Sequence, residues 1–180
     1  QFITSSAQLA LRGSGTEGGW RAVRHAITQY PLRETAARNI ILVTDEDRDD
    51  TDSTITYASL LAEMQGAKAV LNAVVNARFK CGDGSAALGL GQHSVGYKAD
   101  GRGGFQTCPN ASAHGGDGNT INDYVKLALE TGGAAWDIEV LRDGGRVAQS
   151  FTNALLKIKV QEILQQLPTR NLPDVYVHGL

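Results

Sequence analysis

Apolar residues recur at intervals of three and four positions in two stretches of the N-terminal half, which is the spacing of one face of a helix. Pro31 ends the first stretch, because proline cannot continue a helix. Asp52 or Ser53 precedes the second stretch, and both are residue types expected at a helix N-cap. The two predicted helices carry their apolar stripes on Trp20, Val23, Ile27 and Tyr30 and on Tyr57, Leu60, Leu61 and Met64.

Continuous apolar runs follow these helices. Residues 40–43 and 71–77 predict strands that are buried on both faces of a parallel sheet, and residues 135–138 predict a shorter strand. Because strands alternate with helices, the expected fold class is α/β, with a doubly wound, mostly parallel sheet flanked by helices. With 180 residues the chain is long enough for one such domain.

Residues 80–119 interrupt this alternation. The segment holds 11 of the 21 glycines, and no periodic apolar pattern continues through it. A long segment of this kind is a functional excursion, a small glycine-rich hairpin or a flexible insert. We therefore interpret residues 1–180 as a single domain, with residues 80–119 as a glycine-rich insert within it.

Two more helices are expected after the insert. Residues 120–123 form a capping-box pattern, and Gly132-Gly133 ends the helix that follows. Residues 150–167 predict a long closing helix with two apolar stripes on roughly opposite sides. One stripe can face the sheet, whereas the other faces another chain, a part of the protein absent from this sequence, or the interior of the same domain. The stripes are Phe151, Ala154, Leu155 and Ile158, and Val160, Ile163, Leu164 and Leu167.

Composition and charge exclude several classes of protein. The formal net charge of −2 at pH 7 provides no basic field for nucleic acid or for an anionic membrane. No run approaches the ~18 apolar residues that a membrane span needs. The chain begins with Gln1 rather than methionine and does not open on a signal peptide, so we expect a processed or incomplete product.

The two cysteines indicate a secreted protein. Cys81 and Cys108 flank the glycine-rich stretch, and the sequon Asn110-Ala111-Ser112 follows directly. Loop cysteines beside a loop sequon favour a disulfide and a glycosylated Asn110, although two buried thiols also fit the cysteines alone.

Candidate chemistry lies where the first predicted strand ends. Ligands of α/β sheets bind at the carboxyl ends of the strands, and Asp45 stands at that point. Residues 45–52 hold six acids, and clustered carboxylates suit a hard divalent cation. For residues 47–52 we favour a solvated acidic loop instead, with its acids near a helix N-terminus. Asp45 is the candidate metal ligand because the strand fixes its position.

A glycine-rich turn offers a second candidate ligand. Residues 13–18 match the G-x-G-x-x-G pattern of dinucleotide sites, but the residues before them resemble a helix end rather than a strand. Nucleotide binding is therefore the less favoured interpretation. Thr16 provides either a hydroxyl ligand or a helix N-cap.

These segments together resemble the von Willebrand factor A (vWA) domain. Gly15-Thr16-Glu17 before a helix, and residues 38–45 ending in Asp45, are similar to that family's second and third metal-site loops. The glycine pair, short strand and closing helix resemble its C-terminal part, so the similarity covers the C-terminal two-thirds of such a domain. The resemblance implies that Thr16 and Asp45 help to hold Mg²⁺, or Ca²⁺ or Mn²⁺, which an acidic group of a protein or glycan ligand completes.

The family's Asp-x-Ser-x-Ser segment does not occur in this sequence. The domain is therefore expected to be incomplete, and an upstream segment or another chain would supply the rest. Two ligands alone do not satisfy the octahedral preference of Mg²⁺.

Three functions follow from these patterns. The leading hypothesis is a secreted adhesion or matrix-interaction module, which is not an enzyme. The alternative is a structural extracellular scaffold without a working metal site. A nucleotide-binding enzyme is the least favoured, because the segment before residues 13–18 resembles a helix end rather than a strand. The sequence also has no G-x-S-x-G elbow for a serine nucleophile, and its four histidines lack zinc-type spacing.

Overall fold

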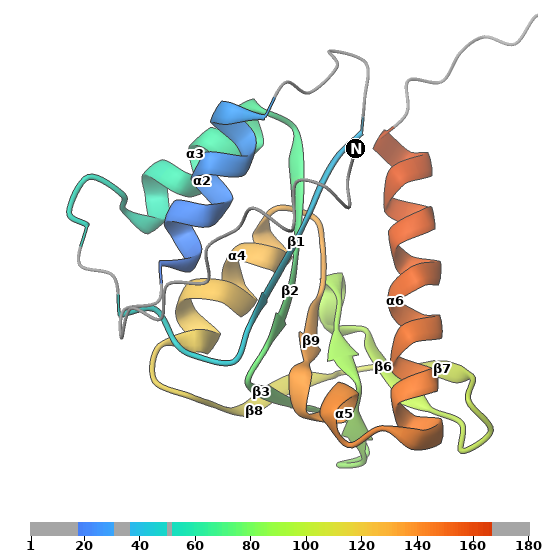
Figure 1. Ribbon diagram of the computed structural model, residues 1–180. Coiled ribbons are helices and arrows are strands. Elements are labelled where there is room, and N and C mark those ends of the chain that lie inside the picture. The colour runs from blue at the N-terminus through green and yellow to red at the C-terminus, as the bar shows by residue number, and fades with distance from the viewer. Residues whose placement is uncertain (1–17, 31–36, 50–51, 167–180) are drawn as a thin grey trace, which may run out of the picture.

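A six-stranded sheet forms the centre of the computed structural model, which describes residues 18–30, 37–49 and 52–166 (Figure 1). Three of its strands are parallel: β1 (Arg38–Thr44) pairs with β2 (Ala69–Val75), and β2 pairs with β9 (Ala135–Asp137). Their carboxyl ends therefore meet at one edge of the sheet. The strands predicted at 40–43, 71–77 and 135–138 are confirmed with shifted ends. The predicted burial of 40–43 on both faces is wrong for the described residues, because Ile41 and Val43 are 47% and 59% exposed on the second face.

The glycine-rich segment adds antiparallel strands rather than parallel ones. β5 (Gly89–Leu90), β6 (Gly96–Ala99) and β7 (Phe105–Cys108) continue the sheet beyond β9. A second, antiparallel sheet has the order β4-β3-β8, formed by Ala86–Ala87, Ala77–Lys80 and Ser112–Gly116. The α/β class is confirmed, but the parallel part of the larger sheet is limited to three strands.

Helices cover both faces of the parallel strands. α2 (Gly19–Gln29), α3 (Tyr57–Gly66) and α4 (Lys126–Glu130) lie on one face, and α6 (Gly145–Gln166) lies on the other (Figure 1). The buried apolar residues form two cores, the first under α2, α3 and α4 and the second under α6. Successive side chains of β2 point to opposite faces, so Leu71 and Val75 lie in the first core and Val74 lies in the second. None of the helices in the described ranges is long and apolar enough to cross a membrane.

Helix starts differ from the predicted ones. Thr56, not Asp52 or Ser53, caps α3 in a capping box with Ser59. The pattern at 120–123 makes no side-chain cap: a π-helical turn (Ile121–Val125) precedes α4, and the buried Thr120 hydroxyl has no hydrogen-bond partner in the described part of the chain. Gly132 ends this helix as predicted, with a φ of 93° that glycine adopts readily. The closing helix begins five residues earlier than expected, at 145 rather than 150.

Candidate functional site

Asp45 lies where the sequence places it, directly after β1 at the carboxyl edge of the parallel strands. Its carboxylate is half-exposed and forms an ion pair with Arg142, with Oδ2 and Nη2 2.5 Å apart. The hydrogen bond from Arg142 holds the pKa of Asp45 below its usual value. Arg142 belongs to α5 (Ile138–Arg142), so this pair joins the end of β1 to the helix that follows β9.

Asp47 and Arg48, which follow in the acidic turn, have structural partners. Asn119 accepts the backbone N–H of Arg48 at 2.9 Å and donates to its carbonyl at 2.6 Å, while Asp47 accepts the N–H of Asn119. The Arg48 guanidinium pairs with Asp123 at 2.8 Å and lies 3.9 Å from the centre of the Trp20 ring. The turn is therefore fastened to the segment before α4 instead of being only solvated. Residue spacing gave no sign of this contact, since the two segments are about 70 residues apart.

Sequence reasoning missed Asp137 at the same edge of the sheet. This residue ends β9, is 8% exposed, and accepts the backbone N–H of Glu139 at 3.0 Å as the N-cap of α5. Burial raises the pKa of its carboxyl above the usual value. The argument used for Asp45, an acid at the tip of a predicted strand, applies equally to Asp137.

The described residues do not by themselves fit a Mg²⁺, Ca²⁺ or Mn²⁺ site. Within 18–30, 37–49 and 52–166, no three Asp, Glu, His or Cys side chains are grouped as metal ligands. Thr16, the other predicted ligand, lies outside the described residues. Asp45 contributes one carboxylate whose charge Arg142 already offsets. Octahedral coordination needs several more oxygen ligands.

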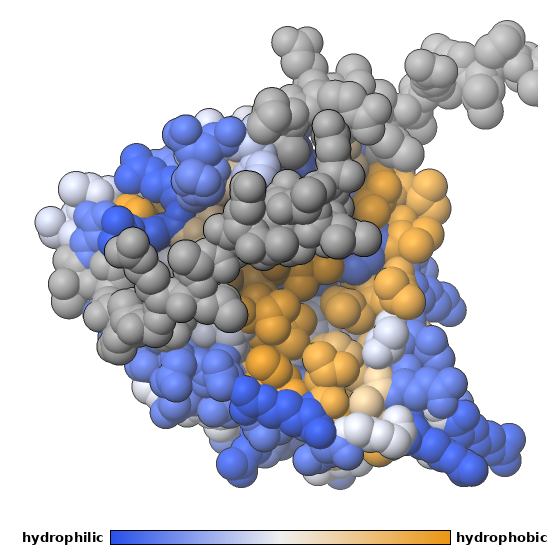
Figure 2. All heavy atoms as spheres, viewed as in Figure 1, coloured by the Kyte–Doolittle hydropathy of each residue, from blue (hydrophilic) through white to orange (hydrophobic). Residues whose placement is uncertain are grey.

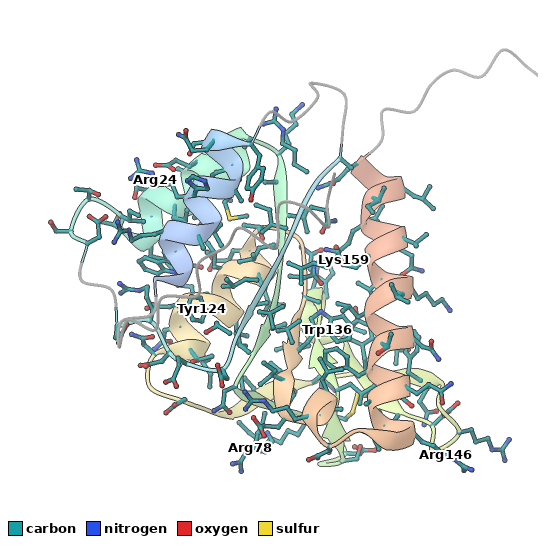
Figure 3. All side chains as sticks on the ribbon, in the orientation of Figure 1. Arg24, Arg78, Tyr124, Trp136, Arg146 and Lys159 are labelled. Carbon is teal, nitrogen blue, oxygen red and sulfur yellow. A yellow bond between two sulfur atoms is a disulfide. The ribbon has the colours of Figure 1, made fainter. Side chains whose placement is uncertain are left out.

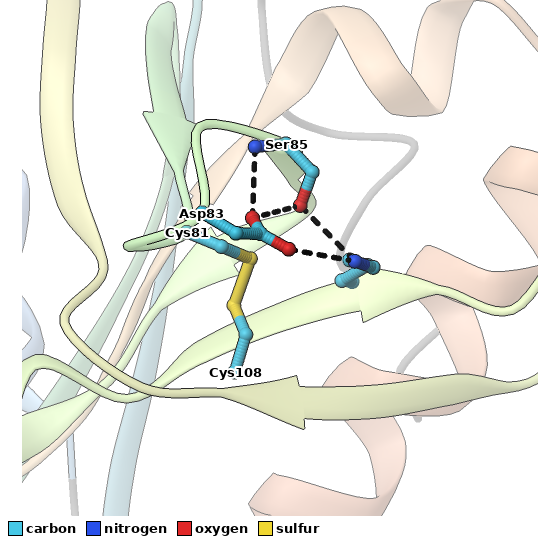
Figure 4. Close-up of a disulfide and its surroundings, with 5 residues drawn as sticks. Cys81, Asp83, Ser85 and Cys108 are labelled. Carbon is cyan, nitrogen blue, oxygen red and sulfur yellow. Dashed lines mark hydrogen bonds and ion pairs between the residues drawn. A yellow bond between two sulfur atoms is a disulfide. The ribbon is translucent and has the colours of Figure 1, made fainter.

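The predicted cysteine pair is a disulfide (Figure 4). Cys81 follows β3 and Cys108 ends β7, so the bond links the two sheets. Asp83 lies beside it and accepts hydrogen bonds from the Ser85 backbone N–H and hydroxyl, while Lys98 pairs with the carboxylate at 3.3 Å. These contacts lower the pKa of Asp83 to about 2, the Ser85 hydroxyl contributing most. The insert is thus a cross-linked, ordered sheet region.

A buried polar network holds α6 to the sheet. Glu162 accepts two hydrogen bonds from Asn72, at 2.9 and 3.1 Å, and pairs with Lys159 at 2.8 Å. Lys159 also contacts Asn39 of β1, and Trp136 donates to Asn72 at 3.0 Å. Figure 3 shows Lys159 and Trp136 between α6 and the strands. Burial lowers the pKa of Lys159, against the opposing effect of Glu162.

An apolar surface lies beside this network. β1 presents Ile40 and Leu42 to the first core, so Ile41 and Val43 point to the face of α6. These two side chains are 47% and 59% exposed. Val160, Ile163 and Leu164 of the second predicted stripe are exposed as well, whereas its fourth member, Leu167, lies outside the described residues. Figure 2 shows apolar side chains from β1 to α6. We call this the β1–α6 surface: Ile41, Val43, Leu156, Val160, Ile163 and Leu164.

Aromatic residues of the insert pack against the core. Tyr97 stacks on Trp136 with ring centres 5.0 Å apart and meets Phe105 edge-on. Trp20 and Trp136 are both buried.

Neither the family models, nor the curated proteins, nor the solved structures with which the chain was compared contain a match to it.

Proposed function

We propose that this chain is an extracellular protein-interaction module of von Willebrand factor A type, serving adhesion or matrix assembly. The observation that carries the proposal is the side of β1 with which no described strand pairs. Among the described strands β1 pairs only with β2, and the Ile41 and Val43 side chains beside that edge remain about half-exposed. An apolar edge strand presents unpaired backbone groups that another strand can bind.

The helices that cover the parallel strands indicate which kind of segment binds beside β1. Parallel strands are normally enclosed by helices on both faces. Here α6 is anchored over β2 and β9, because Glu162 accepts hydrogen bonds from Asn72 and Phe151 packs edge-on against Trp136. It is tied to β1 through the hydrogen bond from Asn39 to Glu162. The outer part of β1 therefore lacks a helix on the α6 face within the described residues.

We infer that the occupant is a β-strand followed by an amphipathic helix, provided by a vWA-type segment upstream or on another chain. The strand extends the sheet beyond β1, and the helix packs on the β1–α6 surface. Contiguous apolar patches of more than a few hundred Å² are rare on isolated proteins and mark interaction sites. The disulfide supports an extracellular setting, because such bonds persist in oxidising compartments.

The proposed binding does not require a metal ion. The resemblance implies that Asp45 and Thr16 hold a cation whose coordination an acidic protein or glycan ligand completes. We propose such a metal site only for a domain that supplies further oxygen ligands. For the 180-residue chain alone, the ion pair of Asp45 with Arg142 favours the scaffold alternative. Added Mg²⁺ is therefore expected to leave the unfolding temperature of this chain unchanged.

Site-specific photo-crosslinking tests the proposal. A photoreactive residue at position 43 is compared with one at Val147, which is 44% exposed on the first turn of α6, outside the surface. The protein is expressed in secreting cells together with its natural polypeptide context, and crosslinked peptides are sequenced. Position 43 is expected to capture one peptide of alternating strand pattern followed by a helical stripe. Capture of a second copy of this chain, or of the same peptides from both positions, would overturn the proposal.

A further inference from the structure

We propose that Asn110 carries an N-linked glycan that shields the free edge of the smaller sheet. Asn110-Ala111-Ser112 is the sole Asn-x-Ser/Thr sequence among the 180 residues. Such sequons accept a glycan where they lie on the surface of a secreted protein. The inference rests on the extracellular setting of the proposed function, but not on the β1–α6 surface.

The sequon has the geometry that the reaction needs. Asn110 and Ser112 are exposed, whereas Ala111 between them is 4% exposed and its N–H donates to the Ser94 carbonyl at 2.8 Å. The central residue is therefore anchored, and the two residues that an enzyme must contact face the solvent. The Asn110 side chain makes no hydrogen bond to any residue in the described ranges.

The backbone around Asn110 also favours asparagine. Asn110 has a φ of 52° in the turn between β7 and β8, a left-handed conformation that asparagine tolerates better than most residues. The turn lies against Gly82, whose N–H donates to the Pro109 carbonyl at 3.0 Å. A Cβ atom on Gly82 would come within 2.9 Å of the Asn110 Cβ. The absence of a side chain at Gly82 therefore allows the turn to pack this closely.

The disulfide supports the proposed extracellular setting, in whose secretory pathway the reaction occurs. Cys108 lies two residues before Asn110, and its bond to Cys81 forms in the oxidising secretory pathway. There, the donor is an oligosaccharide linked to a lipid diphosphate. The Asn110 Nδ2 forms a C–N bond to the anomeric carbon, the C–O bond to the diphosphate breaks, the lipid diphosphate leaves with the electron pair, and one amide proton is lost.

A glycan at this position has a physical consequence for β8. Among the described strands, β8 is an edge strand of the β4-β3-β8 sheet, and it begins at Ser112. Exposed edges pair with other chains and promote aggregation unless something blocks them. A hydrated glycan two residues before the strand covers this edge, whereas the β1 edge keeps its binding role.

Enzymatic release of the glycan in heavy-oxygen water tests the inference. The natural full-length protein is secreted from a eukaryotic cell line, and peptide mass spectrometry reads position 110. We expect labelled aspartate at 110 and a downward gel shift on deglycosylation. Asn110→Gln and Ser112→Ala should both abolish the shift, whereas Ser112→Thr and the matched change at an exposed asparagine, Asn122→Gln, should retain it.

Each result bears on a different claim. Secreted, disulfide-bonded protein with an unmodified Asn110 would overturn the glycan while leaving the proposed function standing. A reduced chain retained inside the cell would overturn both the glycan and the extracellular setting. Ser112→Ala keeps the Asn110 backbone unchanged, so loss of the shift in that variant cannot be attributed to strain in the turn.

Discussion

Removing the carboxylate of Glu162 should strongly destabilise the fold. Glu162 is 7% exposed and accepts hydrogen bonds from Asn72 of β2 and from Lys159, which is 8% exposed. In Glu162→Ala the Lys159 ammonium stays buried without its counter-charge, and the Asn72 amide loses its acceptor. A buried polar group that lacks a partner bears its full desolvation cost.

The size of the effect follows from the burial of both partners. Breaking a buried ion pair by removing one partner typically lowers the free energy of unfolding by about 3–5 kcal/mol. For a chain of this length each 1 kcal/mol shifts the unfolding temperature by roughly 2–4 °C, so we expect a decrease of roughly 10 °C. An exposed ion pair would change stability by less than about 1 kcal/mol.

Urea denaturation followed by tryptophan fluorescence measures the effect, because Trp136 lies in the same network. Gln161→Ala, an exposed change on the same helix, is the control and should alter stability by less than about 0.5 kcal/mol. Lys159→Met/Glu162→Leu should be more stable than Glu162→Ala, since an apolar pair leaves no buried charge. A loss below about 1 kcal/mol in Glu162→Ala would refute the reasoning.

Three further predictions concern other parts of the molecule. Gly133→Ala should destabilise the fold severely, because a Cβ atom there meets the Leu71 carbonyl oxygen. Gly66→Ala has open space around it and should stabilise α3 by about 0.5–1 kcal/mol. Thermal unfolding of both variants checks this prediction, and equal changes in unfolding temperature would contradict it. Replacing Cys81 and Cys108 by serine should lower the free energy of unfolding by about 3–4 kcal/mol, because the bond closes a loop with a sequence separation of 27 residues. Denaturation against the wild type measures the loss, and an unchanged midpoint would count against the bond. Because burial raises the pKa of Asp137 above the 3.8 of an unperturbed aspartate, the folded state holds its proton to higher pH than the unfolded state. Stability should therefore fall as the pH rises above 3.8, and Asp137→Asn should flatten that slope in a pH series of melting curves.

Local patterns predicted the parallel half of the fold well. The run at 40–43 correctly predicted a strand, although not its exposed second face, because a continuous apolar run does not show whether a helix covers each side. The stripe of α3 was predicted correctly, and the structure buries Leu60 and Met64 completely. Both stripes of α6 were also visible, since helical periodicity separates buried Phe151 from exposed Leu164. The assignment to a vWA-type domain stays a prediction.

Other features depend on long-range contacts that no spacing reveals. The strands of the insert are two to five residues long, and their partners are set by tertiary pairing rather than by an apolar period. The ion pair of Asp45 with Arg142 joins residues 97 positions apart. An acid at a strand tip is therefore visible in the sequence, but the cation that neutralises it is not.

The link between Cys81 and Cys108 gives the protein a tolerance to cleavage. The turn at 101–103 between β6 and β7 lies inside the loop that the disulfide closes, and Arg102 in that turn is exposed. A trypsin-like protease that cuts after Arg102 leaves both halves joined through the sulfur atoms. A molecule nicked at this point stays a single covalent species and keeps its two sheets attached, and only a reductant would separate the fragments.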